Sequence, residues 1–319
     1  MKKNKLIISS LTTLALLTSC ATLSGTSNDS ADLHSKDKSP KTIEIQETPE
    51  DIFIKSLEGL TVSRLSSPKE VAKGKKFAAP FVFQVTKADG SPAEGIALTI
   101  EYPASKTEGK INFEKVELIT DAEGKVSYTA EQTSFAAKTT VKAYPSPVSE
   151  EPSLEERLKP FTAEADWKVK SDIGTKGAVL FVWDFNEKDR PVNNSYNIQA
   201  EFRGRGITLV GNGPIGETSY IGKPKALYKD TYDIIGGNAY GYLLYGTIKF
   251  AQPVTALEDG SGYSCILKAE IQAISMKNGD VLYSSTTTYE SKGKNWNECV
   301  SNGKDKLSEL VVSDLIYGL

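Results

Sequence analysis

The chain has 319 residues, of which 39% are hydrophobic and 25% are charged. This length predicts about two domains, each with an apolar core of its own. The formal net charge is −3, so the sequence lacks the basic field that nucleic-acid binding requires. The single histidine, His34, stands in a polar stretch, which argues against histidine-based catalysis and histidine-rich metal sites. We predict no cofactor and no bound metal.

The first twenty residues have the pattern of an export signal. Three lysines precede an apolar run over residues 6–17, which is too short to span a bilayer. The run leads into Leu17-Thr18-Ser19-Cys20, which has the form of a bacterial lipobox. Lipoproteins with this motif are cut just before the cysteine, whose sulfur then carries diacylglycerol. We therefore predict a lipoprotein signal peptide over 1–19 and acylation of Cys20, palmitate included, although an ordinary signal peptide with a chance cysteine is the alternative.

Residues 20–49 are rich in Ser, Thr, Asp and Lys and almost free of apolar side chains. Such a segment cannot bury enough surface to fold, so we predict a flexible tether. Ala21, rather than Asp, follows the cysteine; by the sorting rule familiar from enterobacteria this favours the outer membrane, on its periplasmic face or at the cell surface. No later stretch approaches the roughly 20 apolar residues of a transmembrane helix.

Residues 50–170 have an all-β pattern. Apolar and polar residues alternate over 81–86 and 96–100, and a turn sequence, Ala88-Asp89-Gly90-Ser91-Pro92, lies between them. The proline-rich insert 145–160 is expected to be a long loop. The segments ADGSPAEGIALTIEYP and LITDAEGKVSYTA resemble bacterial immunoglobulin-like domains of the invasin and intimin type. The resemblance implies an immunoglobulin-like β-sandwich that spaces or presents other domains and has no catalytic positions.

Residues 171–319 have a mixed pattern of strands and helices. The continuous apolar run 178–185 is typical of a strand that is buried on both faces. Asn278-Gly279 is the favoured turn pair of a hairpin. The remaining expected elements are a helix from about 195 to 204, a short strand at 207–210, a weak helix within 220–237, strands at 242–250, 263–274 and 280–289, and an amphipathic helix over 295–317.

Three of these segments, AVLFVWDF, GYLLYGTIKF and ILKAEIQAISMKNGDVLYSSTTTYESKG, carry a second resemblance. They are similar to the periplasmic α/β domain shared by the peptidoglycan-synthase activator lipoproteins, the curli-secretion lipoprotein and the amino-terminal domain of TolB. Members of that group bind proteins or assemble into rings, and they are not enzymes. The predicted fold is thus multidomain: an all-β immunoglobulin-like sandwich followed by an α+β domain, a mixed-sheet α/β sandwich that serves for interaction.

Two motifs suggest chemistry. Residues 211–216 match G-x-G-x-x-G after a strand, as in dinucleotide-binding loops. Pro214, however, falls where such a loop should enter its helix, and no strand ending in an acid follows at the required distance, so we expect only a glycine-rich loop. Asp184 ends a predicted strand, where α/β sheets often place ligands. It is a candidate catalytic or metal carboxylate, or it caps a turn.

Further candidates concern partners and cross-links. Arg203 and Arg205, flanked by glycines, are candidates for binding a partner carboxylate, or they are solvated loop charges. Tyr240 and Tyr242 are candidates for an aromatic interface, or they belong to the core. Cys265 and one face of the last helix, which carries Cys299, are expected to meet. The pair is either a disulfide, worth roughly 3–4 kcal/mol in the chain-entropy model, or two buried free thiols.

These observations predict a membrane-anchored, noncatalytic lipoprotein that acts as a protein-protein interaction, assembly or regulatory module of the cell envelope. Its expected partners are the lipid bilayer, through acylated Cys20, and another envelope protein; no nucleic acid is expected, and the oligomeric state stays open. A surface-exposed adhesin that binds host or matrix protein through the sandwich is the alternative. A hydrolase acting from Asp184 is a third possibility.

Overall fold

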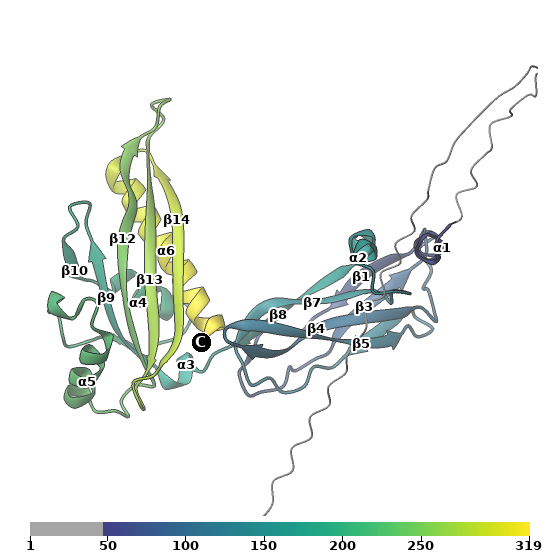
Figure 1. The fold of residues 1–319 in the computed structure, drawn as a ribbon, viewed down its shortest axis with the longest axis horizontal. Coiled ribbons are helices and arrows are strands. Elements are labelled where there is room, and N and C mark those ends of the chain that lie inside the picture. Colours follow the sequence, from purple (N-terminus) through teal and green to yellow (C-terminus); the bar gives the residue numbers. More distant parts are fainter. Residues whose placement is uncertain (1–46) are drawn as a thin grey trace, which may run out of the picture. The chain divides into compact units, whose positions relative to one another are not determined.

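The computed structural model describes residues 47–319 (Figure 1). This part of the chain is α+β, with antiparallel and mixed sheets and helices. One hydrophobic core is built from residues between Val62 and Val169, and two further cores are built from residues between Ile173 and Leu319. The export signal, the predicted lipid site Cys20 and almost all of the predicted tether lie outside the described residues.

Two short helices accompany the first core, where the sequence pattern predicted strands and loop only. Helix α1 (Pro49–Ser56) begins with a capping box, in which the Thr48 side chain accepts from the Asp51 amide. Helix α2 (Pro152–Leu158) lies inside the segment predicted to be a loop. Both begin with proline in the first turn, where its missing N–H costs no hydrogen bond. The proline content of the insert therefore starts a helix and does not exclude one.

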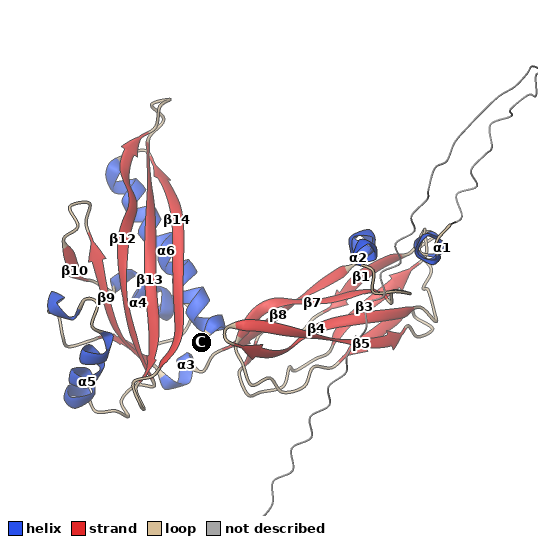
Figure 2. Ribbon diagram, viewed as in Figure 1, coloured by secondary structure: helices blue, strands red, loops and turns tan. Residues whose placement is uncertain are grey.

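Two sheets form the N-terminal domain (Figure 2). The first has the order β1-β3-β6, with β1 (Thr61–Ser66), β3 (Phe81–Thr86) and β6 (Lys125–Tyr128) antiparallel. The second has the order β2-β8-β7-β4-β5 and comprises β2 (Val71–Ala72), β8 (Ala163–Lys170), β7 (Ala137–Pro145), β4 (Ala97–Thr107) and β5 (Lys110–Ile119).

The alternation predicted for 81–86 is confirmed, because Phe81, Phe83 and Val85 are fully buried while their neighbours are only partly so. These residues share one core with Leu98 and Ile100 of the other sheet. The two sheets therefore pack face to face as a β-sandwich.

A mixed sheet with the order β10-β9-β12-β13-β14 forms the C-terminal domain. All eight residues of β9 (Ala178–Phe185) are buried, which confirms the prediction from its apolar run. It runs parallel to β12 (Tyr242–Ala256) and to β11 (Val210–Asn212), and antiparallel to β10 (Pro191–Asn193). The predicted hairpin is also confirmed, as β13 (Tyr263–Ser275) and β14 (Val281–Gly293).

Helices cover both faces of this sheet. Helix α4 (Tyr196–Gly204) and the long helix α6 (Trp296–Gly318) pack on one face, and Figure 1 shows α6 running along β13 and β14. Helix α5 (Pro224–Ile235) packs on the other face through Leu227. The short helices α3 (Ile173–Lys176), η1 (Lys159–Phe161) and η2 (Thr218–Tyr220) complete the described elements. Within residues 47–319 no helix combines the length and apolarity needed to cross a membrane.

Candidate functional site

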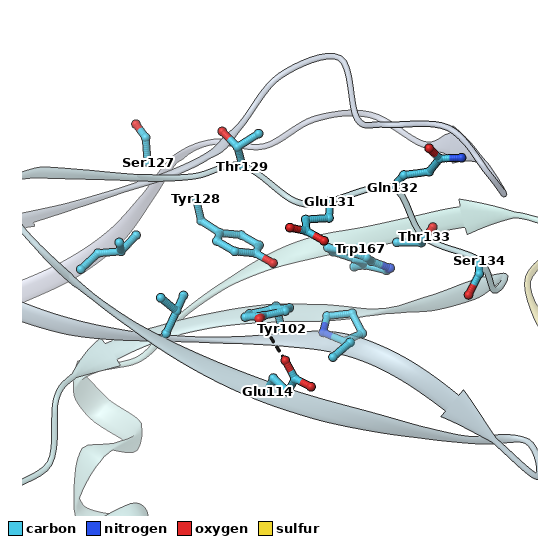
Figure 3. Close-up of a pocket in the computed structure, with 14 residues that line it drawn as sticks. Tyr102, Glu114, Ser127, Tyr128, Thr129, Glu131, Gln132, Thr133, Ser134 and Trp167 are labelled. Carbon is cyan, nitrogen blue, oxygen red and sulfur yellow. Dashed lines mark hydrogen bonds between the residues drawn. The ribbon is translucent and has the colours of Figure 1, made fainter.

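A cavity of about 490 Å³ lies in the N-terminal sandwich, and four strands and one loop contribute to its walls. The cavity is bounded by β4, β5 and β6, by Trp167 of β8 and by the loop that follows β6 (Figure 3). This volume is in the range of small-molecule sites, about 300–1,000 Å³. The lining residues are Tyr102, Pro103, Ala104, Glu114, Val116, Leu118, Ser127, Tyr128, Thr129, Glu131, Gln132, Thr133, Ser134 and Trp167.

One wall carries a carboxylate on a strand face that is otherwise apolar. In the β4–β5 register, Leu98 pairs with Leu118 and Ile100 pairs with Val116, and these pairs contribute to the sandwich core. The next pair on the same face is Tyr102 with Glu114. The Tyr102 hydroxyl donates a hydrogen bond to Glu114 Oε2 over 3.3 Å. The pairing therefore holds a negative charge beside an aromatic ring at the edge of the core.

A second tyrosine stands against the first. The ring centroids of Tyr102 and Tyr128 are 4.7 Å apart, with the ring planes inclined by 30°. Burial raises the pKa of Tyr128, and the charges of Tyr102 and Glu131 add to this effect. Burial also raises the pKa of Tyr102, with a further contribution from the Glu114 charge. Both phenols therefore stay neutral at physiological pH, and their ring faces keep the partial negative charge of an aromatic quadrupole.

Two buried polar atoms of the cavity have no hydrogen-bond partner among residues 47–319. They are Nε1 of Trp167 and Oγ1 of Thr133, and both side chains line the cavity (Figure 3). Trp167 is only 1% exposed, and its ring stacks on Phe81 and meets the edge of Phe77, with centroid distances of 5.7 and 4.8 Å. An unsatisfied buried polar group costs about 1–3 kcal/mol, so a hydrogen bond from water or from a ligand in the cavity would stabilise either atom.

Sequence reasoning missed this cavity. The segment 110–119 was not predicted as a strand, and without that strand no register pairs Glu114 with Tyr102. The signal that could have found it is the alternation Leu118, Val116, Glu114, in which an acid takes a place where the pattern calls for an apolar residue.

The predicted partner-binding residues fall into different environments. Arg203 is exposed and makes no ion pair with any described residue, whereas Arg205 pairs with Glu201 at 2.6 Å and donates to the Glu309 carbonyl. Tyr240 is half-buried against the core beside α5. Tyr242 is 5% exposed and its hydroxyl donates to Asp172, so this residue is a core residue and not a surface residue. The four residues do not form one surface cluster.

The two cysteines outside the export signal meet, as the sequence led us to expect. Cys265 on β13 and Cys299 on α6 are both buried, and their sulfur atoms are 3.5 Å apart with no bond between them in this structure. Burial, with a hydrogen bond to Cys299, raises the pKa of the Cys265 thiol to about 12. The sulfurs are therefore close enough for oxidation after a small shift, and the disulfide remains a prediction.

Asp184 has an ion-pair partner instead of an open position for a substrate. Its Oδ2 accepts from Lys304 Nζ of α6 at 2.5 Å, and the aspartate is 8% exposed. The pair joins the end of β9 to the middle of the helix, which is a structural arrangement. Within residues 47–319 no group of three or more His, Cys, Asp or Glu side chains is placed to hold a metal ion.

The glycine motif also has a packing explanation. A Cβ atom at Gly213 would lie 1.9 Å from the Phe181 ring, and one at Gly211 would lie 3.1 Å from the Tyr240 hydroxyl. No helix follows directly, since the residues after β11 lead only into η2. Packing against the Phe181 ring thus requires glycine at 213, whereas the contact at 211 involves only the Tyr240 hydroxyl.

Comparison with known proteins concerns the C-terminal domain. Residues 177–316 match the family described as TP0693-like lipoprotein, C-terminal domain. None of the curated proteins compared with the chain matches it.

Among solved structures, the chain is similar to the PelC dodecamer of Paraburkholderia phytofirmans, with 19% identity over 44% of this chain and 86% of that chain, at a TM-score of 0.29. Lipoprotein GNA1162 of Neisseria meningitidis matches with 16% identity over 43% and 96% of the chains, at a TM-score of 0.27. The hypothetical protein CT253 of Chlamydia trachomatis matches with 12% identity over 44% and 93%, at a TM-score of 0.27.

Proposed function

We propose that this chain is a membrane-anchored, noncatalytic lipoprotein that binds another protein of the cell envelope through its C-terminal domain. The lipobox at Leu17-Thr18-Ser19-Cys20 supports the anchor, and the match of residues 177–316 to a lipoprotein family agrees with it. In this proposal Cys20 carries the lipid in the outer membrane, and the sandwich, of the bacterial immunoglobulin-like kind, holds the C-terminal domain away from the bilayer.

The main support for partner binding is the edge of β14 that pairs with no described strand. This strand ends the order β10-β9-β12-β13-β14 and, among the described strands, pairs only with β13. Soluble proteins usually protect such an edge with charged residues, proline or a short strand. The opposite edge strand β10 is three residues long, but β14 has thirteen, and its residues 281–289 include no charge and no proline.

The start of the same strand is apolar and accessible. Val281 and Leu282 are 51% and 53% exposed. Further along, Ser284, Thr286 and Thr288 are exposed as well, so uncharged side chains continue along the strand. An extended segment of a partner that pairs with β14 would gain main-chain hydrogen bonds along the edge and bury the apolar start. We therefore assign the partner-binding site to β14.

Site-specific photo-crosslinking in living cells tests this assignment. A photoreactive residue at Leu282 should give a discrete adduct with one envelope protein, and Thr286→Lys in the same chain should reduce that adduct because it places a charge beside the edge. The matched control carries the photoreactive residue at Val192 of β10, an apolar side chain that is 61% exposed. Equal adducts from both positions, or none from Leu282, would refute the assignment.

A further inference from the structure

The residues that line the cavity of the N-terminal sandwich favour a positively charged ligand. Glu114 and Glu131 line it, and none of its lining residues is basic. Both glutamates are exposed, so their charges are available to a ligand that enters from solvent. A second, independent feature is the rigid indole of Trp167, whose buried N–H has no acceptor among the described residues. A molecule that occupies the cavity should thus bring positive charge and an acceptor oxygen.

The two tyrosine rings of the cavity favour an organic cation over a metal ion. Neutral tyrosine rings attract a cation over their faces, and this attraction favours organic ammonium groups, which carry little tightly held water. Tyr102 and Tyr128 stand together on the cavity wall, and Figure 3 shows Glu114 and Glu131 close to them. A metal ion would instead need several converging ligands, and only two carboxylates, Glu114 and Glu131, line the cavity; within residues 47–319 no group of three or more His, Cys, Asp or Glu side chains is placed to hold a metal ion.

We propose that this cavity binds a small organic ammonium compound that also carries a hydroxyl or carbonyl oxygen. The ammonium group lies against the two tyrosine rings, between the carboxylates of Glu114 and Glu131. The oxygen accepts a hydrogen bond from Trp167 Nε1, and Thr133 Oγ1 completes its contacts. The ligand carries no phosphate, because the negative charge of a phosphate would be repelled by the two glutamates and would meet no basic side chain. This site is separate from the β14 edge, so either proposal can fail without the other.

Calorimetric titration of the full mature chain in detergent tests the site with choline as the probe. Its neutral isostere 3,3-dimethylbutan-1-ol has the same shape without the charge, and tetramethylammonium has the charge without the oxygen. We expect choline to bind at least tenfold more tightly than either. Phosphocholine, which has the same head group with added negative charge, should bind more weakly than choline. Binding of choline should also weaken as the salt concentration rises, because the attraction is partly electrostatic.

Two variants on one strand provide the matched comparison. Glu114→Gln removes the charge inside the cavity but keeps the shape and the hydrogen bond from Tyr102. Glu117→Gln removes the same charge from an exposed position three residues further along β5, outside the cavity lining. We expect the first to weaken choline binding about tenfold and the second to leave it unchanged. Circular dichroism checks that both variants keep their fold. The proposal is overturned by the absence of choline binding, by equal binding of the neutral isostere, by tighter binding of phosphocholine, or by equal effects of the two variants.

Discussion

Replacing Lys304 by methionine tests whether Asp184 is a structural residue. The aspartate is 8% exposed, its Oδ2 receives the Lys304 ammonium at 2.5 Å, and its Oδ1 has no partner among the described residues. Methionine preserves most of the apolar stem but leaves the carboxylate buried without its cation. Removal of one member of a fully buried ion pair typically costs about 3–5 kcal/mol, but the Lys304 side chain is 25% exposed, so the cost should lie at or below the lower end of that range. We expect a loss of this size in the free energy that holds α6 on the sheet.

Lys306→Met is the matched control on the same helix. Lys306 pairs with Glu309 at 2.6 Å, but both side chains are more than 40% exposed, so this pair should contribute only about 0–1 kcal/mol. Hydrogen exchange measured by mass spectrometry in increasing urea reports the free energy of opening for peptides of β9 and α6, separately from sandwich peptides. The double variant Asp184→Asn/Lys304→Met should recover much of the loss. A cost for Lys304→Met no larger than that for Lys306→Met would mean that the Lys304–Asp184 ion pair does not stabilise the packing of α6.

Three further predictions follow from the C-terminal domain. In urea denaturation, Gly213→Ala should destabilise this domain by about 1–3 kcal/mol, because the new Cβ overlaps the Phe181 ring. Gly216→Ala is the control and should leave stability unchanged, because a Cβ atom there has no neighbour within 4 Å. Protein isolated from the envelope should contain a Cys265–Cys299 disulfide, and two free thiols in nonreducing mass spectrometry would contradict this. In the reduced chain, burial and the hydrogen bond with Cys299 raise the pKa of Cys265 from 9.0 to about 12, so the folded state holds that proton more tightly. The stability that this thiol contributes is complete below pH 9 and is lost as the pH rises from 9 to 12, so the total decline over this range should be smaller in Cys265→Ala than in the native chain.

Parts of the fold could be predicted because the burial of a strand or helix produces a recognisable pattern of apolar residues along the sequence. Strand β9 is covered on both faces, so its residues form an unbroken apolar run. Strand β3 is covered on one face, so its residues alternate. Helix α6 buries one stripe, which includes Leu307, Val311 and Leu315, at helical spacing. In each case burial alone determines the pattern, and no partner needs to be known.

The site could not be predicted in the same way, because its properties depend on pairs that are distant in sequence. Tyr242 lies in a segment rich in tyrosine, but its hydroxyl is bound by Asp172, 70 residues earlier. In the sequence, Asp184 has the position of a catalytic carboxylate. In the structure it is paired with Lys304, which lies 120 residues later in the chain. The cavity requires the β4–β5 register to pair Tyr102 with Glu114. Cys265 and Cys299 were the exception, because each lies on a face with a clear apolar period.

In the proposed function, a lipid anchor holds the chain where the β14 edge can bind an envelope partner. Photo-crosslinking in cells tests whether partner binding depends on the anchor. The photoreactive residue is placed at Leu282 in the otherwise native chain and in a Cys20→Ala chain, and the adducts are compared at equal protein levels. We expect an adduct with one envelope protein from the native chain and a large loss of that adduct when the cysteine is absent. An adduct that persists undiminished with Cys20→Ala, or no protein adduct from the native chain, would contradict the proposed function.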